Sequence, residues 1–216
     1  MSFYSAIYKV LAAPLRGMFR VRVSHPERLP EDRGCLLCAN HTSMADVVVI
    51  STGIHRQVRY MAKKEIFKVP LIGQLLKALG AYPVDRGGAD ASSVRRTLRF
   101  IEEGQLVGMF PQGTRRPKVD PATTPIKAGA GMIAYHAKCD VIPVFVRAKN
   151  NQVRFFQKTE LLVGEPIPYE ELCFSAGGMK EYTAATQMIF DRICALGREA
   201  EEAEKASRRE NGEEQP

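Results

Sequence analysis

The chain has 216 residues, 45% of them hydrophobic and 25% charged, which fits one ordinary globular domain and requires no second one. Its formal net charge of +7 indicates an anionic partner, which could be nucleic acid, an acidic membrane surface or a phosphorylated substrate. Nucleic acid is excluded because the sequence holds no RNA-binding aromatic signature, no zinc finger and no basic helix followed by heptads.

Residues 1–24 combine large apolar side chains with basic ones, and Met1 to Val23 contain no acid. Lys9 and Pro14 interrupt the apolar stretches, so no stretch approaches the roughly 18 to 20 residues of a membrane-spanning helix. The interruption at Lys9 also argues against a signal peptide. We predict a basic amphipathic segment in the headgroup layer at the cytoplasmic face of a membrane, a peripheral or monotopic contact without a spanning helix. A helix packed on its own domain is the alternative.

From Arg33 onward, short apolar runs alternate with segments of helical period, which is typical of an α/β domain with a mostly parallel sheet flanked by helices. We predict one domain over residues 25–208 with about seven strands, followed by a polar, disordered tail at 209–216. The best-defined helix has Asp90 as its cap and Gly104 as its C-terminal stop. The predicted strands cover 34–39, 58–62, 81–84, 106–110, 141–146, 154–156 and 160–164, and the predicted helices cover 45–54, 70–79, 91–103, 128–137 and 179–206.

The five cysteines are odd in number and scattered, so they predict no disulfide framework and suit a reducing cytosol. Cys35 and Cys38 are separated by two leucines within an apolar run. Residues three apart on a strand point to opposite faces, and no second pair of cysteines follows at zinc-site spacing. We therefore predict no metal site.

The segment Asn40-His-Thr-Ser-Met-Ala-Asp46 directly follows the apolar run Cys35 to Ala39 and places a base near a carboxylate. Residues five apart diverge by roughly 140° on a helix, so His41 must precede the helix and Asp46 must lie in its first turns if the two are to meet. An aspartate that accepts a hydrogen bond from one imidazole nitrogen orients the ring and leaves the other nitrogen to take a proton. Taken alone, the pair also fits a surface histidine and an ordinary helix N-terminal aspartate.

The segment Phe110-Pro-Gln-Gly-Thr-Arg-Arg116 follows the apolar run Leu106 to Phe110 and is typical of an anion site. A glycine lets the backbone approach a ligand, Thr114 offers a hydroxyl, and guanidinium groups match phosphate oxygens in a bidentate way. A solvated turn is an equally good interpretation of this fragment alone.

Together with Gly80-Ala-Tyr-Pro-Val-Asp-Arg86 and Val141-Ile-Pro-Val144, these segments follow the order and spacing of four family blocks. Over Asn40 to Val146 the chain thereby resembles the lysophosphatidic acid acyltransferase (1-acyl-sn-glycerol-3-phosphate acyltransferase) family of glycerophospholipid acyltransferases. One departure is Gln112, where the family block usually reads Phe-Pro-Glu-Gly-Thr-Arg. Glutamine keeps the size and hydrogen-bonding reach of glutamate without its charge, so a positioning role survives.

The resemblance implies the glycerolipid acyltransferase fold and a one-step transfer of an acyl group from a thioester to the free sn-2 hydroxyl of 1-acyl-glycerol-3-phosphate, giving phosphatidic acid. His41 is then the general base and Asp46 orients it. The donor is acyl-CoA or an acyl carrier protein thioester, and no cofactor or metal is expected to be bound. The residues expected to bind substrate phosphate are Arg86, Gly113, Thr114 and Arg115, with Gln112 positioning substrate and Arg116 a weaker choice.

The expected partners are a membrane surface with anionic lipids, a lysophospholipid acceptor and, for the donor, acyl carrier protein. The alternatives are another lysolipid or glycerol-phosphate acceptor and a membrane-bound lipid-binding homologue without catalysis, the latter motivated by Gln112. Dinucleotide binding is a third interpretation, because Gly129-x-Gly131-x-x-Ala134 matches a loose fingerprint. It is rejected because a loop rich in proline and threonine precedes this fingerprint, where a strand is required.

Overall fold

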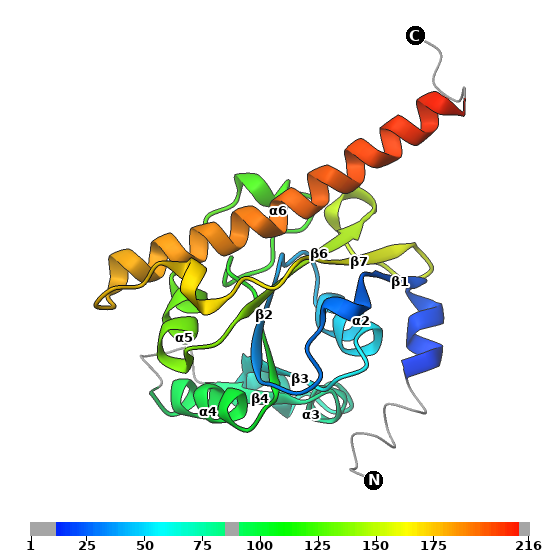
Figure 1. Cartoon of the computed structure of the whole chain (residues 1–216). Coiled ribbons are helices and arrows are strands. Elements are labelled where there is room, and N and C mark those ends of the chain that lie inside the picture. Colours follow the sequence, from blue (N-terminus) through cyan, green and yellow to red (C-terminus); the bar gives the residue numbers. More distant parts are fainter. Residues whose placement is uncertain (1–11, 85–90, 212–216) are drawn as a thin grey trace.

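A seven-stranded sheet forms the centre of the computed structural model, which describes residues 12–84 and 91–211 (Figure 1). Its strand order is β1-β7-β6-β2-β5-β3-β4. The strands are β1 (Val21–Ser24), β2 (Cys35–Ala39), β3 (Val58–Lys63), β4 (Ala81–Val84), β5 (Leu106–Met109), β6 (Val141–Ala148) and β7 (Thr159–Val163).

Strands β2 to β6 are mutually parallel, whereas β7 runs antiparallel to β6 and β1 runs parallel to β7. The carboxyl ends of β2, β3, β4, β5 and β6 therefore lie on one edge of the sheet, together with the amino ends of β7 and β1. We call this the carboxyl edge. In open α/β sheets, ligands bind outside this edge, so it is where a functional site is expected.

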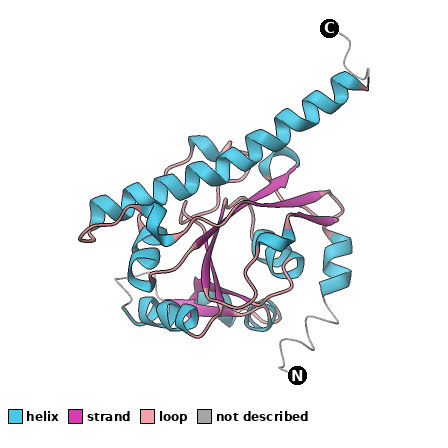
Figure 2. Ribbon diagram, viewed as in Figure 1, coloured by secondary structure: helices cyan, strands magenta, loops and turns pink. Residues whose placement is uncertain are grey.

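Helices cover both faces of the sheet (Figure 2). Apolar side chains of α2 (Ala45–Gly53) and α3 (Ile72–Ala78) pack into one core cluster, and those of α4 (Ala91–Glu102), α5 (Gly129–Ala137) and α6 (Met179–Glu210) pack into a second. All five residues of β2 are buried, which is why this strand reads as a continuous apolar run. Residues 12–18 form a further short helix, and 3-10 turns cover Pro26–Arg28, Lys64–Lys68, Pro121–Thr123, Lys149–Asn151 and Tyr169–Leu172.

Gly104 ends α4 as predicted. Its φ of 77° is in the left-handed region, where a glycine carries no steric penalty. The Gln105 N–H donates to the Phe100 carbonyl at 2.9 Å and the Gly104 N–H donates to the Ile101 carbonyl at 3.0 Å, which is the Schellman pattern. The predicted cap of this helix, Asp90, lies outside the described residues.

The number of strands was predicted correctly, but two of the individual assignments were wrong. Residues 154–156, predicted as a strand, form a loop in which Phe156 has a φ of 60°, incompatible with extended backbone. Conversely, β1 was not predicted. It lies within residues 1–24, the segment assigned to the membrane interface, yet it pairs with β7 as a strand of the domain's own sheet.

The last helix also extends further than predicted. Helix α6 continues to Glu210, so residues 209 and 210 of the predicted disordered tail are helical. Its buried residues end at Gly197, and the remainder projects beyond the sheet (Figure 1). Within the described ranges, no helix is both long and apolar enough to cross a bilayer.

Candidate active site

The site begins where β2 ends at the carboxyl edge. Asn40, fully buried, donates from Nδ2 to the Val146 carbonyl at 3.1 Å and accepts from the Val146 N–H at 2.7 Å. This reciprocal pair joins the end of β2 to β6 through one side chain. The next residue, His41, is thereby held at a fixed point on the edge of the sheet.

Asp46 lies in the first turn of α2 and is fully buried. Its Oδ2 accepts hydrogen bonds from the backbone N–H groups of Thr42 at 2.6 Å and Ser43 at 2.8 Å, and its Oδ1 accepts one from the Thr42 hydroxyl at 3.0 Å. A buried carboxylate is tolerated only with such partners. The loop residues between the two functional groups thus fix the carboxylate in place.

The imidazole of His41 completes this cluster, with Nδ1 lying 2.8 Å from Oδ2 of Asp46. Since an ionised carboxylate only accepts hydrogen bonds, Nδ1 carries the proton and Nε2 is the basic nitrogen. His41 precedes the helix and Asp46 lies in its first turn, so the spatial relation expected from the sequence is present. The His41 side chain remains 16% exposed, whereas that of Asp46 is 0% exposed.

An aromatic ring stacks on one face of the imidazole. The rings of His41 and Phe110 are nearly parallel, with centroids 4.0 Å apart, and Phe110 in turn lies 6.0 Å from the ring of Tyr60. Phe110 directly follows β5, the neighbour of β2. Sequence reasoning gave this phenylalanine no individual role, because the stack depends on the pairing of two strands far apart in the chain.

Gln112 is 2% exposed, and both ends of its amide are engaged within the protein. Its Oε1 accepts the backbone N–H of His41 at 2.6 Å, and its Nε2 donates to the hydroxyl of Thr124 at 2.7 Å. The Thr124 hydroxyl in turn donates a hydrogen bond to the Pro121 carbonyl at 2.7 Å. The structure therefore places Gln112 as a link between the histidine and the loop after β5, and its predicted contact with substrate stays a prediction.

The same loop also holds the other side of the histidine's peptide. The backbone N–H of Arg116 donates to the His41 carbonyl at 2.8 Å, so residues 112–116 bind both backbone groups of His41. The two sequence segments, about 70 residues apart, are in direct contact. Thr124 contributes to this arrangement although no sequence motif points to it.

The remaining predicted phosphate-binding residues near this contact differ in their exposure to solvent. Gly113 has a φ of 65°, and a Cβ added there would meet the Lys127 side chain at 2.8 Å, so both the backbone conformation and the space favour a glycine. Thr114 and Arg115 are exposed at the turn, whereas Arg116 is half-buried. The Arg116 Nε has no hydrogen-bond partner within the described part of the chain. Arg86 lies outside the described residues.

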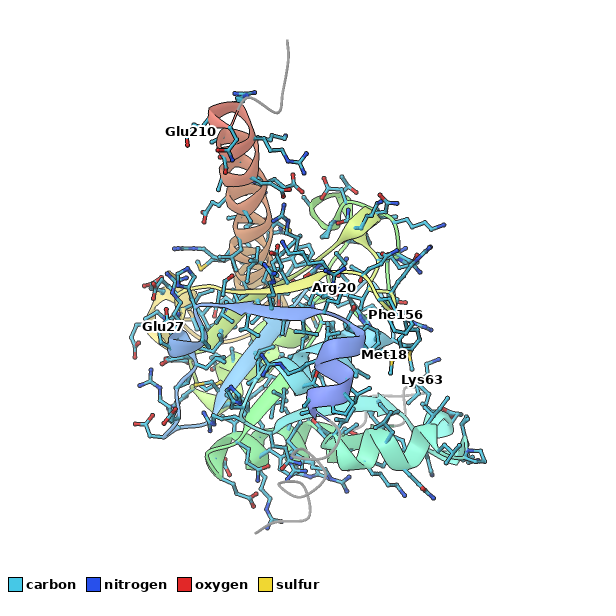
Figure 3. All side chains as sticks on the ribbon, turned by 90° about the vertical axis from the view of Figure 1, so that its right-hand side faces the viewer. Met18, Arg20, Glu27, Lys63, Phe156 and Glu210 are labelled. Carbon is cyan, nitrogen blue, oxygen red and sulfur yellow. The ribbon has the colours of Figure 1, made fainter. Side chains whose placement is uncertain are left out.

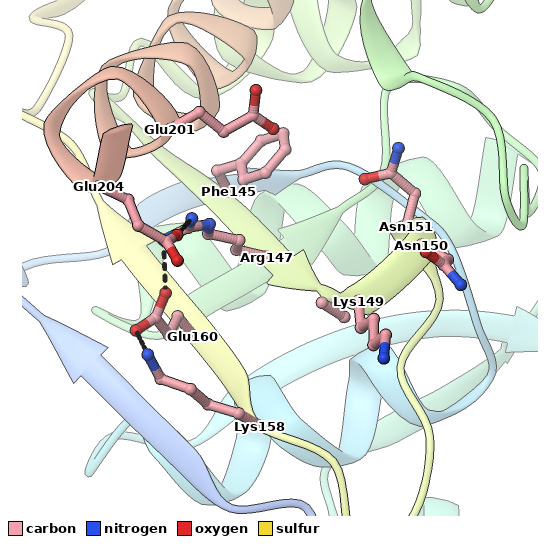
Figure 4. Close-up of a pocket in the computed structure, with 10 residues that line it drawn as sticks. Phe145, Arg147, Lys149, Asn150, Asn151, Lys158, Glu160, Glu201 and Glu204 are labelled. Carbon is pink, nitrogen blue, oxygen red and sulfur yellow. Dashed lines mark hydrogen bonds and ion pairs between the residues drawn. The ribbon is translucent and has the colours of Figure 1, made fainter. Parts of the chain in front are cut away.

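A separate cavity of about 410 Å³ opens at the end of β6 (Figure 4). Four of the six charged side chains that line it are paired with one another: Arg147 binds Glu160 at 3.0 Å and also binds Glu204, and Lys158 binds Glu160 at 2.7 Å. No histidine is among the residues that line it, so it offers no imidazole for general-base chemistry. Among the residues described, no cluster of three or more His, Cys, Asp or Glu side chains could hold a metal ion.

A histidine oriented by a buried carboxylate has the geometry that general-base chemistry requires, and the adjacent turn presents hydrogen-bond donors that an anionic substrate could use. The family model described as Acyltransferase matches residues 20–147, which is more than half of the chain and includes His41, Asp46 and the loop from Phe110 to Thr124. The protein is therefore an acyltransferase by class.

Individual relatives narrow this class. The chain is 34% identical to the 1-acyl-sn-glycerol-3-phosphate acyltransferase of Bacillus subtilis, with 88% of this chain and 96% of that protein covered. It is 28% identical to the human 1-acyl-sn-glycerol-3-phosphate acyltransferase beta, with 69% and 56% covered. The crystal structure of the 1-acyl-sn-glycerophosphate (LPA) acyltransferase from Thermotoga maritima has the same fold, with a TM-score of 0.66 at 21% identity over 90% of this chain and 81% of that one. The chain belongs to the 1-acyl-sn-glycerol-3-phosphate acyltransferase family.

Proposed function

We propose that this protein transfers a fatty acyl group from a thioester to the sn-2 hydroxyl of 1-acyl-glycerol-3-phosphate, giving phosphatidic acid. The observation that carries the proposal is the His41–Asp46 pair at 2.8 Å, with the carboxylate buried and held by three further donors. The names of the relatives from Bacillus subtilis and human support the same acceptor.

In this reaction Nε2 of His41 takes the proton of the acceptor hydroxyl while that oxygen attacks the thioester carbonyl. A C–O bond forms, the C–S bond breaks, and the thiolate leaves with the proton returned from the imidazolium. Asp46 stabilises the imidazolium during the transfer and keeps Nδ1 protonated throughout. The stack on Phe110 and the hydrogen bonds to the His41 backbone keep the ring from rotating away.

The turn that follows Gln112 is the proposed binding place for the acceptor's phosphate. Arg115 and Thr114 present exposed donors there, and the absence of a side chain at Gly113 lets a phosphate approach the backbone. Arg86 is proposed as a second cation on the strength of the family block alone. Gln112, being buried, acts on the substrate through the histidine that it holds.

The proposed donor is acyl-CoA or acyl carrier protein, and the proposed setting is the cytoplasmic face of a membrane that contains anionic lipids. The net charge of +7 supports an anionic surface as partner. A lysolipid acceptor is itself a membrane component, so an enzyme that works at the surface meets it without extracting it into water.

The test is formation of phosphatidate from lysophosphatidate in detergent micelles with either donor. Wild type is compared with His41→Ala and, as a matched control, with His136→Ala, which removes an exposed imidazole on α5. We expect product from wild type and the control, and a loss of at least a hundredfold in His41→Ala with an unchanged melting temperature. Equal product from all three proteins would refute His41 as the base, and no product with either donor would refute lysophosphatidate as the acceptor.

A further inference from the structure

The exposed large apolar side chains are not scattered over the surface. Of the eight such residues in the described ranges, seven lie in segments that directly follow β2, β3, β5 or β6 at the carboxyl edge, and one, Met179, begins α6. Exposed apolar patches of this kind mark interaction surfaces. The seven residues are Met44, Val69, Leu71, Ile72, Val119, Phe155 and Phe156.

Leu71 is held out of the protein by its backbone. It has φ 64° and ψ −49°, and the Ile72 N–H donates to the Pro70 carbonyl at 2.7 Å, which makes a γ-turn of the rare, strained kind. In this conformation Leu71 is 78% exposed. The turn starts α3, because the Leu71 carbonyl accepts from the Leu75 N–H at 2.9 Å, but it leaves the leucine side chain in water. Backbone outliers of this kind are a reason to look for function.

Phe156 repeats the pattern on another loop. Its φ is 60°, a strained value for a bulky residue, and its side chain is 77% exposed. The conformation is fixed by its backbone N–H, which donates to the Met18 carbonyl at 2.7 Å, and by its neighbour Phe155, which stacks on buried Phe19 at 4.8 Å. The two most exposed of the eight apolar residues, Leu71 and Phe156, are thus the two on positive-φ backbone.

The strand order places these two side chains on opposite sides of the histidine. Phe156 belongs to the connection between β6 and β7, His41 follows β2, and Leu71 lies between β3 and β4. In Figure 3, Phe156, Met18 and Lys63 lie on one side of the molecule and Glu27 on the other. The apolar residues therefore flank the proposed catalytic base along the carboxyl edge.

The charges around these residues are mainly basic. Lys63, Lys64 and Lys68 are exposed directly before Leu71, with Glu65 the one acid among residues 63–72. Arg154 is exposed next to Phe155 and Lys118 next to Val119. Apolar side chains ringed by lysine and arginine match the interface of an anionic bilayer. A second copy of the chain fits less well, because a two-fold interface would bring these basic residues against one another.

We infer that the carboxyl edge is a lipid-docking face, on which Leu71 and Phe156 insert among the acyl chains of an anionic bilayer on either side of His41. This inference rests on the proposed function, since docking there presents the site to a lysolipid within the membrane. The basic residues contact the headgroups and set the preference for anionic lipid.

Docking is tested by co-sedimentation with vesicles of phosphatidylcholine, with and without phosphatidylglycerol. The variants are Leu71→Ser, Phe156→Ser and the double variant, and the matched control is Met179→Ser, which makes the same kind of change at a residue 70% exposed but away from this edge. We expect each single variant to bind the anionic vesicles several-fold more weakly, the double variant at least tenfold more weakly, and the control as wild type. Because all these side chains are exposed, melting temperatures should be unchanged.

Two further measurements separate membrane docking from the acyl-transfer reaction. With a short-chain, water-soluble lysophosphatidate the double variant should keep wild-type turnover. With an acceptor embedded in vesicles, its turnover should fall in proportion to its loss of vesicle binding. Wild-type vesicle binding by the double variant would overturn the docking face, as would a dimer in gel filtration that Leu71→Ser dissociates, since a second copy would then occupy this surface. Absence of turnover by any protein on any acceptor would refute the proposed function while leaving the vesicle result to decide the docking face.

Discussion

Replacing Asp46 by asparagine removes one charge from the site with little change of shape. The asparagine oxygen can occupy the Oδ2 position, where it still accepts from Nδ1 of His41 and from the backbone N–H groups of Thr42 and Ser43. The amide nitrogen then faces the Thr42 hydroxyl, which can rotate to accept from it. All four hydrogen bonds survive, so the change isolates the role of the negative charge.

The size of the effect follows from the geometry. An N–O distance of 2.8 Å puts the centres of the imidazolium and carboxylate charges about 4 Å apart. At that separation, and at an effective dielectric of about 20, the attraction is about 4 kcal/mol. It is present only while His41 holds the transferred proton, so its loss raises the barrier and not the energy of the resting enzyme. Since about 1.4 kcal/mol corresponds to a factor of ten, we expect turnover to fall about a thousandfold.

The assay is phosphatidate formation under saturating donor and acceptor, with thermal melting followed in parallel. Asp46→Asn should lose turnover while KM for the acceptor and the melting temperature stay close to wild type. Asp46→Ala should lose both turnover and stability, because it leaves four buried or half-buried donors without their acceptor. A loss of turnover below tenfold in a stable Asp46→Asn protein would refute the assignment of Asp46 as the group that stabilises the imidazolium.

Three other predictions concern groups around and beyond the site. Thr124→Val removes the acceptor of the buried Gln112 amide and should lower turnover and cost about 1 to 3 kcal/mol of stability, whereas Thr124→Ser should restore both; equal activity of the two variants contradicts the role of this hydroxyl. Alkylation of the native protein should modify Cys173 alone, because the other four cysteines are buried, and mass spectrometry showing two or more rapid adducts would contradict this. Burial alone would raise the pKa of Glu160, but a hydrogen bond from Lys158 and nearby positive charges lower it below 4.5. Its ionised form therefore stabilises the fold above its unfolded pKa and this contribution is lost as pH falls through the folded value. Glu160→Gln should lower the melting temperature at pH 7, and the difference from wild type should shrink as the pH is lowered through the acid range.

Local patterns predicted the core of the fold and the contact between His41 and Asp46. The boundaries of β2 and α2 follow from a buried apolar run and a helical segment, and the His41–Asp46 contact depends only on the turn between them. Such short-range geometry is accessible from sequence because five residues leave few ways for the two side chains to meet. The Schellman end of α4 at Gly104 was accessible for the same reason.

The errors have physical causes of another kind. β1 has four residues at the edge of the sheet and includes Arg22, so its pattern carries little strand signal, and it is recruited by pairing with β7 far along the chain. Residues 154–156 contain two phenylalanines and look like a buried strand, yet the backbone turns at Phe156 and exposes both rings. Only the tertiary contacts decide which apolar run is covered and which is left on the surface.

The position of Gln112 shows how a site can keep its geometry without the charge that the family block usually carries there. The side chain at position 112 needs an oxygen that accepts a hydrogen bond from the His41 N–H and a second polar atom that forms a hydrogen bond with Thr124. Glutamine satisfies both while Thr124 donates to Pro121. A glutamate would have to accept the Thr124 hydroxyl hydrogen, which would release the Pro121 carbonyl, and would add a second negative charge next to the His41 backbone. The Gln112 amide therefore fits the hydrogen-bonding pattern of its own loop, and His41 has Asp46 as its carboxylate partner.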